Sequence, residues 1–288
     1  MSDSIEDVYV RTYETNVRHL AQQGITRLRP YVLERSVSSE AHNWERMHPT
    51  DQAVVKTGRG GATPQEMTAW SRRQSVPTTF QVGDITGTED IVQMIVDPNS
   101  NYAKAHGKEM RRQQDRDIIE AAVGDSRDGA GAAVPFDANQ NIGDGTGAFT
   151  YDTITAVSEK FMDNDVDPDE PKIFVVSPAM ARKLLQTTEF ISGDYNARRP
   201  LTEKGYIDNH MGYSWVVSTL LQSPGANERY AFAMTFDAIG LQMNRDITAE
   251  IQKDPSASFD WRIYCEGTWG AIRIQDEKLV RVHIDETI

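Results

Sequence analysis

The sequence predicts an α+β fold. Segments with helical periodicity and segments with a strand pattern follow one another in mixed order, and no internal repeat is present. The last fifth of the chain, Tyr230–Ile288, consists of short β-rich runs that contain no nucleophile elbow, metal cluster or phosphate loop. A chain of this size that closes on a β-meander without a reaction centre is more typical of a building block than of an enzyme.

Composition favours a globular protein that does not read nucleic-acid sequence. At 288 residues, 39% hydrophobic and 25% charged, the chain is long enough for one large domain or two medium ones. Its 43 acidic and 30 basic residues give a net charge of −13, which disfavours sequence-specific binding to DNA or RNA. The same charge suits a protein that lies beside packed nucleic acid without adhering to it.

Targeting signals are not apparent. The acidic start, Met1–Asp7, does not have the layout of a signal peptide, and no apolar run approaches the roughly 20 residues that span a bilayer. The single cysteine, Cys265, lies in an apolar run and is expected to be a small buried hydrophobe. We therefore expect a soluble protein made in a reducing compartment.

The N-terminal quarter predicts a helix followed by a segment without its own core. Ile5–Gln23 has one apolar helical face, formed by Val10, Tyr13, Val17 and Leu20. Leu28–Leu33 continues as an extended or short helical arm. Ser36–Val76 holds too little apolar mass to pack a core, which indicates a long hairpin over a neighbour or a mobile loop. Phe80–Ile85 returns to a strand pattern.

The longest predicted helix is Asn101–Val123, with Asn99 or Ser100 as its N-cap and Gly124 as its end. At 1.5 Å per residue it is roughly 33 Å long. The residues of its apolar face are Ala103, Met110, Ile118, Ile119, Ala121 and Ala122. The residues of its polar face are Lys108, Arg111, Arg112, Asp115 and Arg116.

The second half alternates helices and strands. Gly124–Gly147, rich in Gly, Asp and Asn, predicts an exposed loop, and Thr187–Glu203 predicts a polar one. Helices are predicted at Tyr151–Met162 and from Pro178 through Gln186, the latter with Ser177 as N-cap. Strands are predicted at Lys172–Ser177, Ser214–Leu221, Tyr230–Phe236, Trp261–Ile274 and Leu279–Ile284.

Three short motifs fail the chemistry that they suggest. Asp163–Glu170 alternates oxygen ligands like the start of a calcium loop, but Pro168 and Phe174 stand where that loop needs Gly and Glu. We predict a helix-ending loop there. Gly143–Ala148 lacks the spacing of a dinucleotide loop and predicts a turn. Lys56–Gly61 is not a phosphate loop, because its Lys precedes the glycines.

Isolated ionisable residues give no site. The six histidines, at 19, 42, 48, 106, 210 and 283, form no metal-binding pair within a helix. Glu250 and Glu266 could meet only in space, which the sequence does not show. The pairs Arg72-Arg73, Arg111-Arg112 and Arg198-Arg199 favour salt bridges between chains over a phosphate-binding face. No catalytic, cofactor-binding or metal-binding residue is predicted.

In this order, the elements resemble the major capsid proteins of tailed bacteriophages, which have the Hong Kong 97-type fold. The similarity extends over nearly the whole chain. It is sharpest at Asp97–Gly124, and it is also clear at Phe174–Leu185, Gly205–Ser218 and Trp269–Val282. Each piece alone is a common helix or strand, and their joint order and spacing carry the resemblance.

The resemblance implies a domain plan. Residues 1–35 would be the N-terminal arm and 36–78 the extended loop that lies on the adjacent subunit. Residues 79–149 and 244–288 would form the peripheral domain, with the long helix as its spine. Residues 150–243 would form the axial domain, with Thr187–Glu203 near the capsomer axis.

The implied function is a capsid subunit that self-assembles into pentamers and hexamers of an icosahedral shell around double-stranded DNA. The implied partners are further copies of itself, a portal, a decoration protein and DNA held by non-specific contact. A separate scaffolding protein is expected, since few residues precede the arm helix. The resemblance also implies assembly in the bacterial cytoplasm, location in the virion, and no enzyme activity, cofactor or membrane contact.

Two other function classes remain open from the sequence. An encapsulin-like nanocompartment shell would share the fold and differ in cargo, and a soluble hydrolase could assemble a site from scattered acids. Some family members crosslink a Lys to an Asn of a neighbour by means of a Glu. Lys56 lies in the matching loop, but no Asn and Glu match, so crosslinking is not expected.

Overall fold

The computed structural model describes residues 22–50, 53–56, 58–60, 67–87, 99–187, 207 and 209–287. Most of the expected helix at Ile5–Gln23 and of the polar loop at Thr187–Glu203 lies outside these residues. The chain divides into two compact units. Unit 1 comprises Met1–Ile25, Phe80–Arg112 and Ile247–Gly267, and unit 2 comprises Thr26–Thr79, Gln113–Asp246 and Thr268–Ile288.

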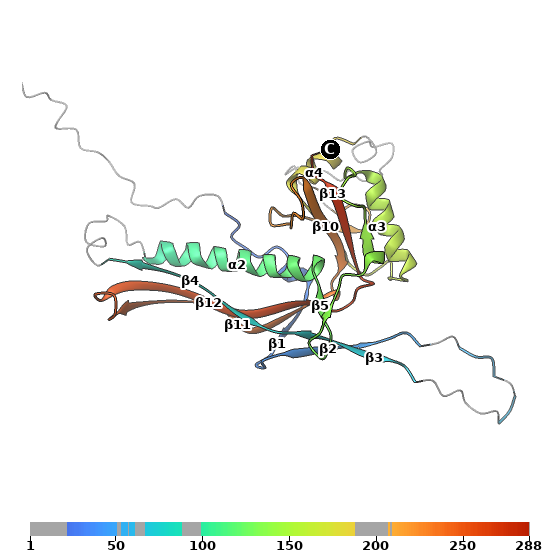
Figure 1. Cartoon of the computed structure of the whole chain (residues 1–288), viewed down its shortest axis with the longest axis horizontal. Helices are drawn as coiled ribbons and strands as arrows, with labels where there is room; N and C mark the ends of the chain where they lie inside the picture. Colours follow the sequence, from blue (N-terminus) through green and yellow to red (C-terminus); the bar gives the residue numbers. More distant parts are fainter. Residues whose placement is uncertain are drawn as a thin grey trace, which may run out of the picture. The chain divides into compact units, whose positions relative to one another are not determined.

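Unit 2 contains a five-stranded sheet covered by two helices (Figure 1). Its strand order is β7-β13-β10-β8-β9. The strands are β7 (Asn141–Ile142), β8 (Lys172–Val176), β9 (Tyr213–Val217), β10 (Glu228–Thr235) and β13 (Leu279–Asp285). β10 pairs antiparallel with both β13 and β8, whereas β8 pairs parallel with β9. The strand expected at Ser214–Leu221 is present as β9, which ends at Val217 and is therefore shorter than predicted.

The two helices of this sheet confirm the periodicity of the sequence. α3 (Tyr151–Asp163) buries Ile154, Val157 and Phe161, the face that its 3.6-residue period predicts. α4 begins at Pro178, and the Ser177 hydroxyl accepts a hydrogen bond from the Met180 N–H at 3.2 Å, as expected for an N-cap. α4 ends at Leu184, two residues before the predicted Gln186. These helices pack on a core with Phe174, Ala231 and Val282.

A four-stranded sheet has the order β1-β11-β12-β4. Its strands are β1 (Leu33–Ser36), β4 (Thr78–Thr86), β11 (Ile239–Asp254) and β12 (Asp260–Arg273). β1 runs parallel to β11, with Leu33 opposite Gly240, and follows a short 3-10 helix, η2 (Arg29–Tyr31). The extended or short helical conformation predicted for Leu28–Leu33 is therefore confirmed. β11 is not among the predicted strands. The expected single closing meander is also wrong, because β10 and β13 belong to one sheet and β11 and β12 to the other.

The long predicted helix is present as α2 (Asn99–Val123), and Ile118 and Ile119 are buried as its apolar face predicts. Asn99 and Ser100 already lie within the helix and are not its N-cap. Asp115 was predicted on the polar face but is buried. Its carboxylate accepts hydrogen bonds from the backbone N–H groups of Arg27 at 3.0 Å and Leu28 at 3.2 Å, which compensate for the loss of water. Within the described ranges, no helix combines the length and apolar content that crossing a membrane requires.

The segment at Gly124–Gly147 corrects a prediction. It is not a plain exposed loop, because buried Ser126 and Gln140 tie it to the fold. It contains β5 (Ser126–Arg127), β6 (Ala133–Val134), the 3-10 helix η3 (Ala138–Gln140) and β7. The Asp137 carboxylate caps η3 by accepting the Asn139 N–H at 2.9 Å. A composition typical of turns therefore gave no sign of the short strands, one of which, β7, pairs with the distant strand β13.

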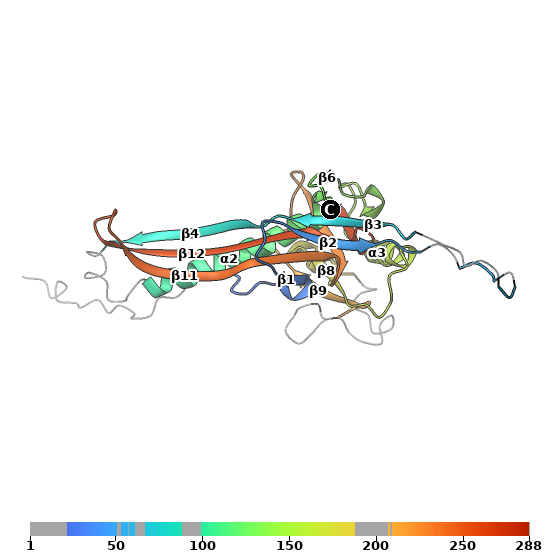
Figure 2. The same ribbon diagram turned by 90° about the horizontal axis from the view of Figure 1, so that it is seen from below.

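The Ser36–Val76 segment forms a hairpin. β2 (His42–Met47) and β3 (Trp70–Ser75) pair antiparallel as a sheet of two strands, visible side by side in Figure 2. One part of the prediction is wrong, because the hairpin does contribute to a core. Trp44 is buried in a cluster with Ile272 and Ile274.

Candidate functional site: the hairpin and its arginine junction

The outer end of the β2–β3 hairpin exposes large apolar side chains. Met47 and Trp70, opposite each other in the ladder, are 61% and 65% exposed. Beyond them, Val54, Val55 and Met67 are also exposed. Apolar residues gathered at one end of a ribbon are typical of a surface that contacts a partner.

The inner end of the same hairpin is anchored by Trp44. Its indole N–H donates to the Ser75 hydroxyl at 3.0 Å, and that hydroxyl donates to the Gln242 side-chain oxygen at 2.7 Å. Gly240 lets the indole approach β11, since a Cβ at that position would lie 2.6 Å from the Trp44 ring. The inner end is thus built into the four-stranded sheet through side chains.

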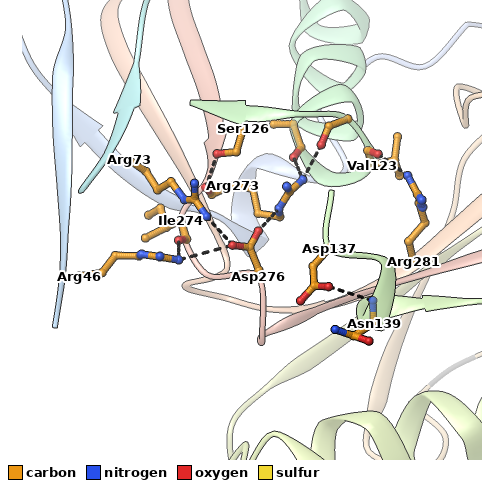
Figure 3. A network of polar contacts seen from close by, with 12 residues as sticks. Arg46, Arg73, Val123, Ser126, Asp137, Asn139, Arg273, Ile274, Asp276 and Arg281 are labelled. Carbon is orange, nitrogen blue, oxygen red and sulfur yellow. Dashed lines mark hydrogen bonds and ion pairs between the residues drawn. The ribbon is translucent and has the colours of Figure 1, made fainter. Parts of the chain in front are cut away.

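Three arginines from separate strands converge on one carboxylate, Asp276 (Figure 3). Arg73 of β3 lies 2.5 Å and Arg273 of β12 lies 2.6 Å from its oxygens, and Arg46 of β2 lies at 3.6 Å. Burial alone would raise the pKa of Asp276, but the hydrogen bonds and charges of Arg273 and Arg73 lower it below its usual value. We call this cluster the arginine junction.

Arg273 of the junction and the nearby Arg281 cap the C-terminal end of α2. Arg273, fully buried, donates to the carbonyl of Gly124 at 2.5 Å, and Arg281 donates to that of Val123 at 2.9 Å. These are carbonyls that a helix leaves without internal partners, at the end where its dipole favours cations. The ring of Phe136 lies 4.7 Å from the Arg273 guanidinium and 4.0 Å from that of Arg281.

The arrangement is suited to holding separate elements of the fold together. The arginine junction links the hairpin, the end of α2 and the turn between β12 and β13 through one ion cluster. Within it, the Nε atom of Arg73 and one terminal nitrogen of Arg273 are buried without a hydrogen-bond partner among the residues that the structure describes. The junction offers a fixed base from which the hairpin extends.

Other sequence candidates lie apart from the junction. Asp163–Glu170 is the predicted helix-ending loop between α3 and β8, and among the described residues no group of three ligands could hold a metal ion. Cys265 is buried as expected. Glu250 and Glu266 accept hydrogen bonds from Gln252 and Tyr264, respectively. Lys56 is exposed.

Two of the histidines and two of the arginine pairs have partners within the described chain. His42 packs edge-on against Trp44, and His283 contacts Glu228 at 2.8 Å. Arg72 and Arg73 pair within the chain, with Glu45 and Asp276, although bridges between chains were favoured for them. Arg111 donates to the Gly24 carbonyl at 2.8 Å, and Arg112 lies 3.9 Å from Glu109. His19 and Arg198-Arg199 lie outside the described residues.

Sequence reasoning missed Arg46, Arg273, Asp276 and Arg281. One signal was available, since Arg273 lies between Ile272 and Ile274 in an apolar strand and is followed three residues later by an acid. An arginine in that position is buried only if it is paired.

Known proteins were then compared with the chain. The model of a family described as phage capsid protein matches residues 5–286. No curated protein matches. The solved capsid of cyanophage P-SCSP1u matches with a TM-score of 0.78 at 12% identity, covering 99% of this chain and 95% of that chain. The structure of Mycobacterium phage Che8 matches with a TM-score of 0.72 at 14% identity, covering 99% of each.

A capsid of a native GTA particle matches with a TM-score of 0.72 at 11% identity, over 97% of this chain and 96% of that chain. At such identities these structures establish the fold, and they agree with the Hong Kong 97-like class predicted from the sequence. The family match does not favour the nanocompartment alternative. Because the family model extends over nearly the whole sequence, the chain belongs to the phage capsid protein family.

Proposed function

We propose that this chain is the major capsid protein of a tailed phage, assembling into pentamers and hexamers of an icosahedral shell around double-stranded DNA. The observation that carries the proposal is the division of the hairpin. Its base is fixed by buried Trp44 and the arginine junction, while Met47 and Trp70 expose apolar surface that the described chain does not cover. A second copy would bury this surface.

The domain plan belongs to the same proposal. Residues 1–35 serve as the arm, 36–78 as the extended loop, 79–149 and 244–288 as the peripheral domain, and 150–243 as the axial domain. The shell is not an enzyme. Its net charge of −13 supports weak, sequence-independent contact with packaged DNA. Scaffolding, portal and decoration proteins are its further partners, and assembly takes place in the bacterial cytoplasm.

The test is electron microscopy of the expressed protein, with and without a scaffolding protein. We expect closed particles of virus-head size from the unaltered chain. Replacing residues 49–68 by a short glycine linker should leave a folded subunit, because Trp44, Arg46 and Arg73 remain in place. It should impair assembly, because the exposed apolar residues Val54, Val55 and Met67 are removed from the outer end of the hairpin. Removing Glu45–Arg73 instead would also take away two arginines of the junction, and so would not separate folding from assembly.

A point variant sharpens the test. Trp70→Ser should reduce particle yield while the circular dichroism spectrum stays unchanged. Met162→Ser, which alters an equally exposed apolar residue of α3, serves as the matched control and should assemble normally. A stable monomer with catalytic turnover, or normal particles without residues 49–68, would contradict the proposal.

A further inference from the structure

Unit 1 contains an open groove of about 430 Å³ between α2 and strands β11 and β12. Gly107, Ile247, Ala249 and Cys265 form part of its lining. A Cβ added at Gly107 would meet nothing within 4 Å, so the glycine leaves space on the groove side of the helix. Glycine costs about 1 kcal/mol relative to alanine inside a helix, because its backbone loses more conformational entropy on folding.

The helical wall of the groove is basic. Lys104, Lys108 and Arg111 lie at i, i+4 and i+7 of α2, which is one side of the helix, and all three line the groove. Arg111 donates to the Gly24 carbonyl at 2.8 Å. Lys104 and Lys108 have no acidic partner within the described part of the chain. An apolar floor beside two uncompensated cations fits an acidic, amphipathic segment.

The described chain begins beside this groove. The Gln22 side-chain amide donates to the Glu109 carboxylate at 3.0 Å, and Gly24 is held by Arg111. Both α2 residues lie within one helical turn of Lys108. Residues 1–21 are therefore attached to the fold at the groove, which gives them an effective concentration on the order of millimolar with respect to it.

The composition of residues 1–21 complements the groove. They contain four acids, Asp3, Glu6, Asp7 and Glu14, against two bases, Arg11 and Arg18. Their apolar residues Val10, Tyr13, Val17 and Leu20 fall on one face of the predicted helix. The apolar face of this segment thus matches the apolar floor of the groove, and its acids match the basic wall.

We propose that residues 5–20 of the same chain dock in this groove, with the face of Val17 on its apolar floor and the acids toward Lys104 and Lys108. The inference concerns the isolated subunit and does not rest on shell assembly. Docking would cover the groove and neutralise the charges of Lys104 and Lys108. The N-terminal segment would then bind to α2 of its own subunit before any partner is present.

Disulfide trapping in the full-length protein tests the proposal. With Cys265→Ala as background, Ala249→Cys is combined with Val17→Cys. Ala249 is exposed at the groove, and Thr15→Cys, on the opposite face of the predicted helix, is the matched control. Because a disulfide needs Cα atoms within about 7 Å, we expect a yield on the order of tenfold higher for the Val17 pair than for the Thr15 pair. Peptide mapping should find the bond within one chain.

The remaining outcomes overturn the proposal. Equal yields from the two pairs, or no bond in either, would exclude docking by the apolar face. A disulfide-linked dimer would assign the groove to the arm of a second copy.

Hydrogen exchange gives an independent check without any cysteine change. Amides of residues 5–20 should be protected in the unaltered subunit and should lose protection in Lys104→Glu/Lys108→Glu. Unprotected amides in the unaltered subunit would also overturn the proposal, as would protection that persists when the charges are reversed.

Discussion

The two ends of the β2–β3 hairpin share one backbone ladder and differ in almost everything else. At the inner end, Trp44 is 6% exposed and Arg73 is 5% exposed, and both are tied to residues that lie far along the chain. At the outer end, Trp70 is 65% exposed, and Met47 opposite it in the ladder is 61% exposed. The difference shows that regular strand pairing does not decide whether a hairpin is buried or exposed. The contacts of its side chains decide this.

The largest effect should come from the centre of the junction. Asp276→Ala leaves Arg73 and Arg273, whose side chains are 7% and 0% exposed, without their counter-charge. Removing one partner of a buried ion cluster costs about 3–5 kcal/mol. We expect a loss of that size in the free energy of unfolding, measured by urea denaturation. A loss below about 1 kcal/mol would mean that the junction behaves like a surface pair.

The same carboxyl predicts acid sensitivity. The pKa of Asp276 lies below its usual value in the folded state, so the folded state binds this proton less readily than the unfolded chain does. Its contribution is present at neutral pH and is lost as the pH falls below about 4. The free energy of unfolding, measured from pH 7 down to about pH 2, should fall less steeply below about pH 4 in Asp276→Ala than in the unaltered protein.

The two tryptophans provide a matched pair. Trp44→Ala opens a cavity between the hairpin and Ile272, and a buried aromatic truncated to alanine costs about 3–5 kcal/mol. Trp70→Ala should change the free energy of unfolding by no more than about 0.5 kcal/mol. Equal losses in the two variants would remove the distinction between the ends of the hairpin.

Asp117 is a half-buried carboxyl whose hydrogen-bond donors are a tryptophan and a glutamine, not an arginine, and it should behave in the opposite way to Asp276. Burial raises the pKa of Asp117 to about 6, despite hydrogen bonds from Trp269 at 2.6 Å and Gln113 at 3.0 Å. The folded state therefore favours the protonated form, and stability falls as the pH rises from about 4 to 6. Asp117→Asn should stabilise the protein on the order of 1 kcal/mol at pH 8, after allowance for partial exposure, and not at pH 4.

The smallest effect should come from the exposed pair beside the junction. Glu45 and Arg72 lie 3.0 Å apart on the hairpin, with side chains 54% and 60% exposed. Exposed pairs contribute about 0–1 kcal/mol. Glu45→Ala should therefore leave the urea midpoint nearly unchanged. A loss comparable to that of Asp276→Ala would show that the network extends to the surface.

Local patterns allowed much of the fold to be predicted. The period of 3.6 residues placed α2 and α3, Ser177 and Pro178 marked the start of α4, and β-rich runs located β8, β10, β12 and β13. β11 was missed although Ile239, Leu241 and Met243 alternate with Gly240 and Gln242, because the polar run Asn244–Asp246 follows them directly. Asp115 was misplaced because its partners, the amides of Arg27 and Leu28, are almost 90 residues away.

The sequence by itself therefore determined the α+β class and the order of the elements, since each element depends on a local pattern of residues, and the joint order of these elements carried the capsid resemblance. Only the tertiary structure decided which strands share a sheet and which charges meet. Asp276 is joined to Arg73 across 203 positions and Trp269 to Asp117 across 152. Such contacts follow from how the chain packs, because an ion pair depends on distance in space and on burial, and neither is expressed in the spacing of residues along the chain.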